Sequence, residues 1–455
     1  MKRHIHFIGI GGIGMSGLAQ LWLLRGAKIS GSDLRENNII QQLQKLGAEI
    51  FIGHKAKNIE GADTVIYSSA IKEDNPEILA AKRKNILLLR RAQALAELMQ
   101  GKSVVTITGS HGKTTTTSLV SCLLLEAGFS PTVAIGGILK NIDANAYLGE
   151  GNFFVAEADE SDGSFLYYYP KYSIITNIDY EHLDYYKEFK NIVATFKQFI
   201  YQTDKSGCVF ACYDDYNLRE LLDGYQNEYI LFGLDEKAQI YPKNIKFSGV
   251  SSEFDVYYKS KYLDRFFLPL GGMHNISNAL AVIALGLYLK IDLGIIKKSL
   301  ANYKGAGRRI EIKYKDNNYL VLDDYAHHPT EIKATILAIK NLNPKRIIAI
   351  FQPHRYSRTK LLFHEFANSF NLVDLLIITD IYPAGESPLE GITSNCIYDE
   401  IRKNNPDKKV YFLPKEKIIP FVLKIIEPKD LIITLGAGDI TKTANELVEA
   451  IKRKS

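Results

Sequence analysis

The sequence of 455 residues contains no apolar run that approaches the roughly 18 residues needed for a transmembrane helix. We therefore expect no insertion into a membrane. The first seven residues, Met1 to Phe7, lack a long apolar core and a small-residue cleavage site. An apolar core and a cleavage site are typical of a secretory signal peptide. Because this segment has neither, the sequence does not predict secretion.

Cysteine is scarce. The four cysteines are scattered along the chain, which excludes a disulfide framework: Cys122, Cys208, Cys212 and Cys396. Cys208 and Cys212 lie in a strand-like run whose alternation places both on one face, and we predict buried free thiols there rather than a metal site. These features predict a protein of the reducing cytoplasm.

The excess of positive over negative charge is also small, since the formal net charge is only +5. The two short basic clusters, at 82–84 and 452–454, have no interleaved aromatic residues. Solvated surfaces account for them, and we predict no binding of nucleic acid. No low-complexity segment or short repeat is present.

Strand and helix patterns alternate along the whole chain. This alternation predicts an α/β fold with mainly parallel sheets, and the length predicts about three domains. We place the domains at 1–100, 101–305 and 306–455. Expected strands cover 28–32, 63–69, 153–157, 173–177, 208–211, 319–323, 346–351, 375–379, 410–413 and 431–435. Expected helices cover 15–25, 91–100 and 277–289, and a last amphipathic helix carries Ile440, Ala444, Leu447, Val448 and Ile451 on one face.

The most informative segment is 104–117, where a β-rich run ends in Gly109-Ser110-His111-Gly112-Lys113-Thr114. We expect the following helix to begin at Ser118. Glycines let backbone amides converge on phosphate oxygens, the lysine adds a cation, and the threonine hydroxyl can reach Mg²⁺. This loop predicts a nucleoside triphosphate site, although Ile107 stands where the strict P-loop pattern has its first glycine.

A second glycine motif, Gly9-x-Gly11-x-x-Gly14, follows a strand and opens a helix. Asp33 follows about 20 residues later, as in dinucleotide-binding sites. Taken alone, this motif favours an NAD-dependent dehydrogenase. A UDP diphosphate satisfies the same requirement, and a glycine turn that only packs strand against helix is the alternative without a ligand.

Two acidic stretches follow strands. Residues 157–162 place carboxylates where they can hold Mg²⁺ beside the phosphate loop. In 176–184, His182 stands among Asp179, Glu181 and Asp184. It is either a structural histidine or a ligand of metal or phosphate.

Histidines and arginines gather in four motifs toward the end of the sequence, at 272–275, 308–309, 323–329 and 352–359. The run His327-His328-Pro329 can be a helix N-terminal turn with proline at its first position. Arg355 and Arg358 can form a solvated helix face. As a pair they can instead bind a carboxylate or phosphate through two parallel hydrogen bonds.

Together these motifs resemble the Mur ligase family over the whole chain. The resemblance rests on 6–17, 109–115, 157–165, 324–331 and 351–355. That family's phosphate loop has the short Gly-x-x-Gly-Lys-Thr form, which accounts for Ile107. It implies a Rossmann-like N-terminal domain that binds a UDP-sugar, a central P-loop ATPase-type α/β domain, and a C-terminal Rossmann-like α/β domain that carries part of the amino-acid site.

The resemblance also implies roles for individual residues. UDP-sugar contacts are expected at Gly11, Gly12, Ser16, Asp33, His54, Ser68 and Ser69. ATP contacts are expected at Gly109, Ser110, His111, Gly112, Lys113, Thr114, Thr115, Asn275, Arg309 and Asp324. Magnesium ligands are expected at Thr114, Glu157 and His182, and the carboxylate and amino-acid site at His327, His354, Arg355 and Arg358. Catalysis is expected to involve Lys113, Glu157, His182, His327 and Arg355.

The activity implied by the resemblance is an ATP- and Mg²⁺-dependent amide ligation in peptidoglycan precursor synthesis. ATP phosphorylates the lactyl carboxylate of UDP-N-acetylmuramate, and the amine of L-alanine displaces phosphate. A monomer or homodimer is expected. Small departures from the family pattern are Ser110, Glu181 and Met273, and of these Met273 bears on an adenine or phosphate contact.

Three alternatives remain open at this point. The first is the recycling ligase of the same family, which attaches an intact tripeptide to the same nucleotide sugar. The second is a nicotinamide-dependent oxidoreductase, which would leave Lys113, Glu157 and His182 without a purpose. The third is a nucleotide-binding scaffold without catalytic activity.

Overall fold

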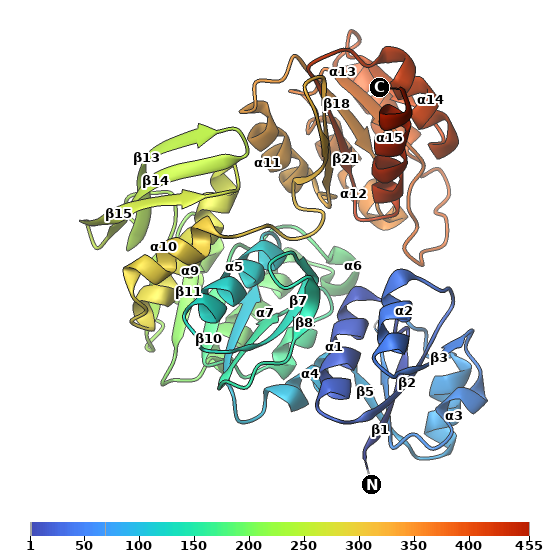
Figure 1. Ribbon diagram of the computed structural model, residues 1–455, viewed down its shortest axis with the longest axis vertical. Coiled ribbons are helices and arrows are strands. Elements are labelled where there is room, and N and C mark those ends of the chain that lie inside the picture. The colour runs from blue at the N-terminus through green and yellow to red at the C-terminus, as the bar shows by residue number, and fades with distance from the viewer. Residues whose placement is uncertain (1, 69, 455) are drawn as a thin grey trace. The chain divides into compact units, whose positions relative to one another are not determined.

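The structure is a computed structural model that describes residues 2–68 and 70–454 (Figure 1). The chain divides into two compact units. The first comprises residues 1–243, 254–267 and 277–304, and the second comprises 244–253, 268–276 and 305–455. In the described part of the chain, no helix combines the length and the apolar character that crossing a membrane requires, as the sequence predicts.

The first unit begins with a five-stranded sheet of order β3-β2-β1-β4-β5, in which every pair is parallel. This is the order of a Rossmann-like sheet and confirms the predicted class. Its strands are β1 (His4–Ile8), β2 (Lys28–Asp33), β3 (Glu49–Ile52), β4 (Thr64–Tyr67) and β5 (Leu87–Arg90). Its helices are α1 (Ile13–Leu24), α2 (Asn38–Lys45), the 3-10 helix η1 (Ala56–Ile59), α3 (Pro76–Arg83) and α4 (Arg91–Met99).

A ten-stranded sheet follows, of order β15-β14-β13-β12-β11-β10-β6-β9-β7-β8. Its central strands pair in parallel, and β7 and β8 pair antiparallel. The strands are β6 (Ser103–Thr108), β7 (Thr132–Leu139), β8 (Ala144–Tyr147), β9 (Phe153–Glu157), β10 (Tyr172–Ile175), β11 (Cys208–Cys212), β12 (Tyr229–Phe232), β13 (Ile240–Ser248), β14 (Ser251–Tyr258) and β15 (Lys261–Leu268). The helices are α5 (Lys113–Glu126), the 3-10 helix η2 (Ser164–Tyr167), α6 (Leu183–Tyr186), α7 (Phe189–Gln202), α8 (Tyr216–Leu222), α9 (Met273–Tyr288) and α10 (Leu293–Ala301).

The second unit contains a six-stranded sheet of order β16-β17-β21-β18-β19-β20, parallel except for the pair β16–β17. The strands are β16 (Glu311–Lys315), β17 (Tyr319–Asp324), β18 (Arg346–Phe351), β19 (Leu375–Ile378), β20 (Val410–Phe412) and β21 (Asp430–Leu435). The helices are α11 (Pro329–Lys340), α12 (Tyr356–Ala367), α13 (Asn395–Asn404), α14 (Lys415–Ile425) and α15 (Ile440–Lys454).

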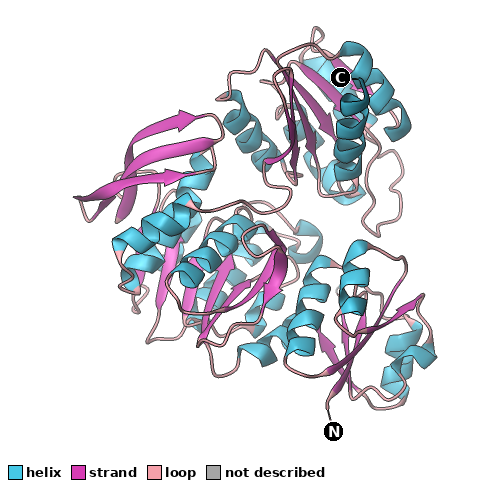
Figure 2. Ribbon diagram, in the orientation of Figure 1, coloured by secondary structure: helices cyan, strands magenta, loops and turns pink. Residues whose placement is uncertain are grey.

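Helices cover both faces of this six-stranded sheet (Figure 2). Side chains of β18 alternate: Ala349 packs with α11, α12 and α13, whereas Ile350 packs with α14 and α15. The five apolar residues that the sequence places on one face of the last helix are all buried, which confirms that prediction.

Three helices begin earlier than the sequence predicts, and the first of them, α1, begins at Ile13 rather than Met15. Helix α5 begins at Lys113 rather than Ser118, because the four threonines at 114–117 are buried in it despite their weak helix propensity. The hydroxyl of Thr117 donates to the carbonyl of Lys113 at 2.8 Å. Helix α9 begins at Met273 rather than Ser277.

The cysteines have the predicted environment. Cys122, Cys208 and Cys212 are free and buried, and Cys396 is free and half-buried. Burial raises the pKa of Cys208 to about 12 and that of Cys212 to about 11. Both thiols therefore stay protonated at neutral pH, which disfavours metal binding by these two side chains.

Candidate functional site

The phosphate loop joins the end of β6 to the first turn of α5, and its two glycines have positive φ angles. Gly109 has φ +126° and Gly112 has φ +86°. A Cβ atom on Gly109 would lie 2.2 Å from the hydroxyl oxygen of Thr176. A side chain at this position is excluded both by the backbone conformation and by space.

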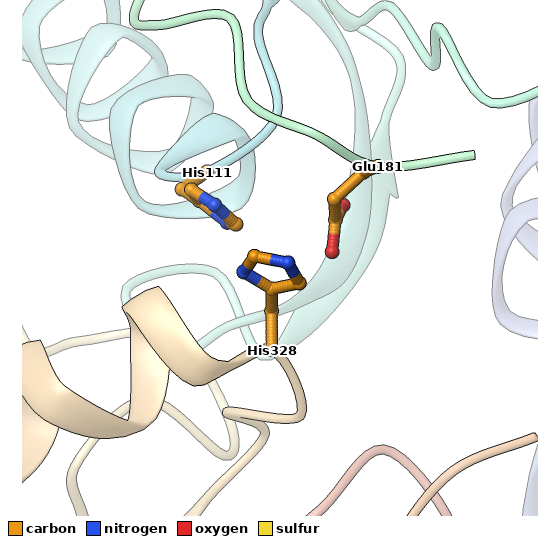
Figure 3. Close-up of side chains that lie close together, drawn as sticks. All are labelled: His111, Glu181 and His328. Atoms are coloured by element: carbon orange, nitrogen blue, oxygen red, sulfur yellow. The ribbon is translucent and has the colours of Figure 1, made fainter. Parts of the chain in front are cut away.

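The segment after β10 holds this loop in place. The amides of Ser110 and His111 donate to the carbonyl and the side-chain oxygen of Asn177, at 3.0 and 2.8 Å. The Ser110 hydroxyl accepts from the amide of Asp179 at 2.8 Å. The imidazole Nε2 of His111, labelled in Figure 3, lies 2.9 Å from Asp179 Oδ2. The sequence predicts a metal or phosphate role for this segment and misses this positioning role.

The amides of Ser110 and His111 therefore already have hydrogen-bond partners within the protein. The expected anion site is limited to the amides that follow them in the loop. The first four amides of a helix have no partner inside the helix. In α5 these belong to Gly112, Lys113, Thr114 and Thr115. They combine with the positive potential of the helix N-terminus to favour a phosphate at the start of α5.

The side chain of Lys113 folds back over its own loop. Its Nζ donates to the carbonyl oxygens of Gly109 and Ser110, at 2.6 and 3.1 Å, and to Glu160 Oε1 at 2.9 Å. Burial lowers the pKa of Lys113, but Glu160 and neighbouring carboxylates outweigh it and raise the pKa above its usual range. Lys113 is a fixed cation, and Glu160 is a site residue that the sequence prediction left unassigned within its acidic stretch.

The structure brings Thr114 and Glu157 together, from the first turn of α5 and the end of β9. The Thr114 hydroxyl donates to Glu157 Oε2 at 2.9 Å, and the amide of Gly136 donates to the same oxygen at 3.0 Å. Two oxygen donors at this distance match the preference of Mg²⁺ for hydroxyl and carboxylate ligands.

His182 lies beside carboxylates at the start of α6. Its Nε2 is 3.4 Å from Glu160 Oε1 and 3.4 Å from Glu181 Oε2. Burial lowers the pKa of His182, but hydrogen bonds to the two carboxylates outweigh it and raise the pKa to about 9. In the described residues, Glu160, Glu181 and His182 offer ligand atoms within 4.8 Å of one another.

The N-terminal glycine loop is held by two side chains. Asp33 Oδ2 accepts from the amide of Gly11 at 2.9 Å, and the Asn37 side chain donates to the carbonyl of Gly11 at 3.2 Å. One oxygen of Asp33 is thus used by the loop itself rather than left for a ribose. The amide of Gly12 donates to Gly9 across the turn at 3.3 Å.

Other predicted UDP-sugar residues lie around the same loop. The Ser16 hydroxyl donates to the carbonyl of Ile13 at 2.9 Å and accepts from Asn145, on β8, at 3.2 Å. His54 follows β3, and its Nδ1 lies 2.9 Å from the Ser32 hydroxyl. Ser68 accepts from the amide of Ala70 at 3.1 Å. The predicted Ser69 lies outside the described residues.

Arg91 was not predicted. It opens α4, its guanidinium lies against Gly14, and its Nη2 is 4.0 Å from Asp159 Oδ2. It therefore connects the glycine loop of the first sheet with the acidic segment after β9. The sequence around Arg91 gives no signal of this role, because both contacts are distant in sequence.

In the second unit, the predicted ATP residues divide into two places. Asn275 is buried, and its side chain donates to the carbonyl of Gly271 at 2.8 Å. Asp324 ends β17 and accepts from the amides of Ile310 and Ala326, at 2.6 and 2.8 Å. Burial raises the pKa of Asp324 to about 6, although Arg309 opposes the shift.

Arg309 and Tyr325 lie beside Asp324. The guanidinium of Arg309 lies over the Tyr325 ring, 5.3 Å from its centroid, and 3.9 Å from Glu331 Oε1. The tyrosine face and the carboxylate thus hold the cation at the end of β17. Tyr325 was not predicted as a site residue.

The residues predicted for the amino acid also gather in the second unit. The rings of His327 and His354 meet edge to face at a centroid distance of 5.6 Å. Arg358 Nη1 donates to His354 Nδ1 at 3.2 Å. Burial, together with His327 and the nearby Arg358, Arg355 and Arg308, lowers the pKa of His354 to about 2. His354 is therefore a neutral acceptor held by Arg358.

Arg355 precedes α12 with φ +70°, and its amide donates to the carbonyl of Tyr382 at 2.9 Å. Both Arg355 and Arg358 are half-buried, which contradicts the alternative of a solvated helix face.

The alternative that His327-His328-Pro329 forms a helix N-terminal turn holds in part. His328 caps α11, and Pro329 occupies the first turn of that helix. Figure 3 labels His328 at the start of this helix. The prediction of a helix N-terminal turn therefore describes the backbone at His328 and Pro329.

Comparison with protein families gives three matches along the chain. The model described as Mur ligase family, catalytic domain, matches residues 4–103. The Mur ligase middle domain matches 107–286, and the Mur ligase, glutamate ligase domain, matches 308–438.

Individual relatives match over nearly the full length. The UDP-N-acetylmuramate–L-alanine ligase of Geotalea uraniireducens (strain Rf4) is 44% identical over 448 residues, which is 98% of each chain. The crystal structure of UDP-N-acetylmuramate-alanine ligase from Thermotoga maritima superimposes with a TM-score of 0.85, at 31% identity over 99% of this chain and 100% of that one. A murein peptide ligase from Psychrobacter arcticus has a TM-score of 0.73 at 24% identity, over 99% of this chain and 98% of that one, which shows a shared fold.

Proposed function

The chain belongs to the Mur ligase family, and we propose that it joins L-alanine to the lactyl carboxylate of UDP-N-acetylmuramate with cleavage of ATP to ADP and phosphate. The observation that carries the proposal is the 44% identity, over 98% of both chains, to a ligase of that name. The proposed reaction belongs to the cytoplasmic synthesis of peptidoglycan precursors, carried out by a monomer or a homodimer.

The reaction needs ATP because a carboxylate is a poor electrophile. A carboxylate oxygen attacks the γ-phosphorus, ADP leaves, and the product is an acyl phosphate. The amine of L-alanine attacks the acyl carbon, and the carbon–oxygen bond to phosphate breaks. The amine proton goes to a base, so the products are the amide, ADP and phosphate.

The phosphate loop supports the first step. We assign the β- and γ-phosphates to the amides at the start of α5 that have no partner inside the helix, and to the Lys113 ammonium. In this role the phosphates replace the two loop carbonyls and Glu160, which Lys113 contacts at present. A preorganised cation and backbone dipoles stabilise charge on the transferring phosphoryl group without reorganising in the reaction.

We assign Mg²⁺ to Thr114 and Glu157, whose oxygens lie 2.9 Å apart. When bound there, the ion would neutralise charge on the phosphate oxygens. His182 fits less directly, because its raised pKa keeps a proton on the ring that metal binding would have to displace. Its neighbours Glu160 and Glu181 make it a hydrogen-bond donor beside the phosphate loop.

For the amine proton, the geometry favours His327 over His182. The Nδ1 of His327 lies 3.0 Å from the carbonyl oxygen of Tyr325 and 3.2 Å from Glu331 Oε2. Both neighbours are acceptors, so Nδ1 carries a hydrogen. We propose that His327 takes the amine proton through its other ring nitrogen, and that Arg355 and Arg358 hold a carboxylate.

The remaining assignments are also proposals. The UDP-sugar is expected at the glycine loop, around Gly11, Gly12, Ser16, Asp33, His54, Ser68 and Ser69. The adenine and ribose of ATP are expected at Asn275, Arg309 and Asp324. The expected division of labour follows the domains 1–100, 101–305 and 306–455.

The test is release of ADP by the purified protein with UDP-N-acetylmuramate, ATP and one acceptor at a time. L-Alanine is expected to support turnover, and the intact tripeptide used by recycling ligases is not. Turnover with the tripeptide and none with alanine would identify the recycling ligase instead. NAD(P)H binding without any ATP cleavage would favour the oxidoreductase alternative.

A further inference from the structure

A buried carboxylate lies beneath the proposed UDP-sugar site and is absent from the expected site residues. Glu77, in the first turn of α3, is completely buried. Its Oε1 accepts from the side chain of Asn58 at 2.6 Å and from the amide of Lys55 at 3.2 Å. Its Oε2 accepts from the Ser32 hydroxyl at 2.6 Å.

Two buried histidines lie beside this carboxylate. His4 Nδ1 faces the carbonyl of Gly61 at 2.8 Å, and Ser30 links His4 Nε2 to His6 Nδ1 with two contacts of 2.8 Å. His6 Nε2 lies 3.5 Å from Glu77.

Three donors satisfy the ionised form of Glu77, because the Asn58 side chain and the Lys55 amide donate to Oε1 and the Ser32 hydroxyl donates to Oε2. The pKa of Glu77 agrees: burial raises it, but hydrogen bonds from His6 and Ser32 outweigh this and leave it below its usual value.

An ionised Glu77 fixes the direction of the next hydrogen bond. A carboxylate only accepts, so the single Ser32 hydrogen points to Glu77. The Ser32 oxygen can then only accept from His54 Nδ1, 2.9 Å away. Glu77 Oε2, at 3.4 Å from the same Nδ1, is also an acceptor. Nδ1 of His54 carries the hydrogen, and the Nε2 of the neutral ring carries a lone pair.

His54 occupies the edge of the sheet where a nucleotide is expected. It follows β3 directly, and the amide of the preceding Gly53 donates to the Asp33 carbonyl at 2.8 Å. All five strands are parallel, so their carboxyl ends lie at one edge together with the glycine loop after β1. The His54 side chain is 12% exposed, so its ring reaches this surface.

We propose that Glu77 is a positioning residue, which acts through Ser32 to present His54 Nε2 as a hydrogen-bond acceptor for a hydroxyl or N–H group of the uridine nucleotide. The proposal rests on the proposed binding of a UDP-sugar at this sheet edge. It predicts a preference for ligands that donate at this point, because a methylated donor would lose the bond.

The first test reads the tautomer of His54 in the unliganded protein. Nitrogen NMR of ¹⁵N-histidine-labelled protein near pH 8 reports which ring nitrogen carries hydrogen, and the missing signals of a His54→Gln variant assign the ring. The expected result is hydrogen on Nδ1 and none on Nε2. Hydrogen on Nε2 would overturn the proposal without reference to any ligand.

Glu77→Gln tests the origin of this tautomer. The amide nitrogen of glutamine donates where Oε2 accepted, so Ser32 turns its hydrogen to His54 and the hydrogen of the ring moves to Nε2. We expect the tautomer to reverse and the affinity for UDP, measured by calorimetry, to fall about tenfold or more. Affinity for ATP is expected to stay within twofold.

The matched control is Glu73→Gln, an exposed glutamate just before α3 that pairs with Lys82. It is expected to leave both the tautomer and UDP affinity unchanged. A Glu77→Gln protein that keeps hydrogen on Nδ1 would overturn the role of Glu77. UDP binding that is unaffected by His54→Ala would instead overturn the proposed nucleotide contact, and the tautomer result would stand separately.

Discussion

Among single residues, Lys113 has the clearest predicted effect. It is the cation of the phosphate loop and is held by two carbonyls and Glu160. Lys113→Ala is expected to lower kcat/KM for ATP at least about a hundredfold, the scale of losing one preorganised electrostatic contact. The control is the exposed Lys205→Ala. Turnover of Lys113→Ala within twofold of the unmodified protein would refute its role.

Asp324 predicts a specific pH dependence of stability. Its pKa is raised by burial from 3.8 to about 6. Between these values the folded state holds a proton that the unfolded state has lost, so its contribution falls as pH rises from about 4 to 6. A shift of about two units corresponds to roughly 3 kcal/mol.

The measurement is the free energy of unfolding in urea at several pH values, for the unmodified protein and for Asp324→Asn. The difference between the two cancels the titration of other carboxylates. As pH rises from 4 to 6, the unmodified protein is expected to lose unfolding free energy relative to Asp324→Asn. Above pH 7 the difference between the two proteins is expected to be constant. A difference that stays flat through this range would contradict the raised pKa.

Sequence alone predicts a role for residues that lie within a recognisable motif, such as Lys113 and Thr114 in the phosphate loop. It does not identify Glu160, Asn177, Arg91 or Glu77, because each acts through partners distant in sequence. Thr114 meets Glu157 across 43 positions because parallel strands of one sheet bring the two residues to the same edge.

Among the elements, the β6–loop–α5 unit depends on the backbone of Gly109. Gly109→Ala forces a side chain into a φ of +126° and into contact with Thr176. We expect it to lower the unfolding free energy by about 2 kcal/mol or more and to weaken ATP binding. Chemical denaturation and ATP titration measure the two effects.

Gly128→Ala, beyond the other end of α5, is the matched control. Its φ is +75°, but a Cβ there has no neighbour within 4 Å. It is expected to cost about 1 kcal/mol from backbone strain alone and to leave ATP binding unchanged. Equal effects of the two substitutions on ATP binding would show that the loop geometry is not what binds the triphosphate.

Strong strands were predicted from their apolar runs, and β9 and β18 match the expected limits residue for residue. The patterns predict none of the strands β13, β14 and β15, which lie side by side in Figure 1. From Lys243 to Ser248, β13 alternates between half-buried and exposed positions. Polar and aromatic residues there give a weak periodic signal, so only tertiary pairing identifies such strands.

For the whole molecule, the chemistry predicts a change of conformation on binding. The proposed phosphate loop belongs to the first unit and the proposed amino-acid residues to the second. An acyl phosphate must also be protected from water while it waits for alanine. Small-angle X-ray scattering with ATP and UDP-N-acetylmuramate is expected to give a smaller radius of gyration than the free protein. Identical profiles would count against closure.

The central claim is that ATP activates a carboxylate by transfer of a phosphoryl group. The direct measurement uses UDP-N-acetylmuramate labelled with ¹⁸O in its lactyl carboxylate, with ATP and L-alanine, and mass analysis of the phosphate released. In the proposed reaction the carboxylate oxygen that attacks phosphorus leaves with it, so each phosphate is expected to carry one oxygen from the carboxylate. Amide formed together with phosphate free of the label would contradict the acyl phosphate and the roles assigned around it.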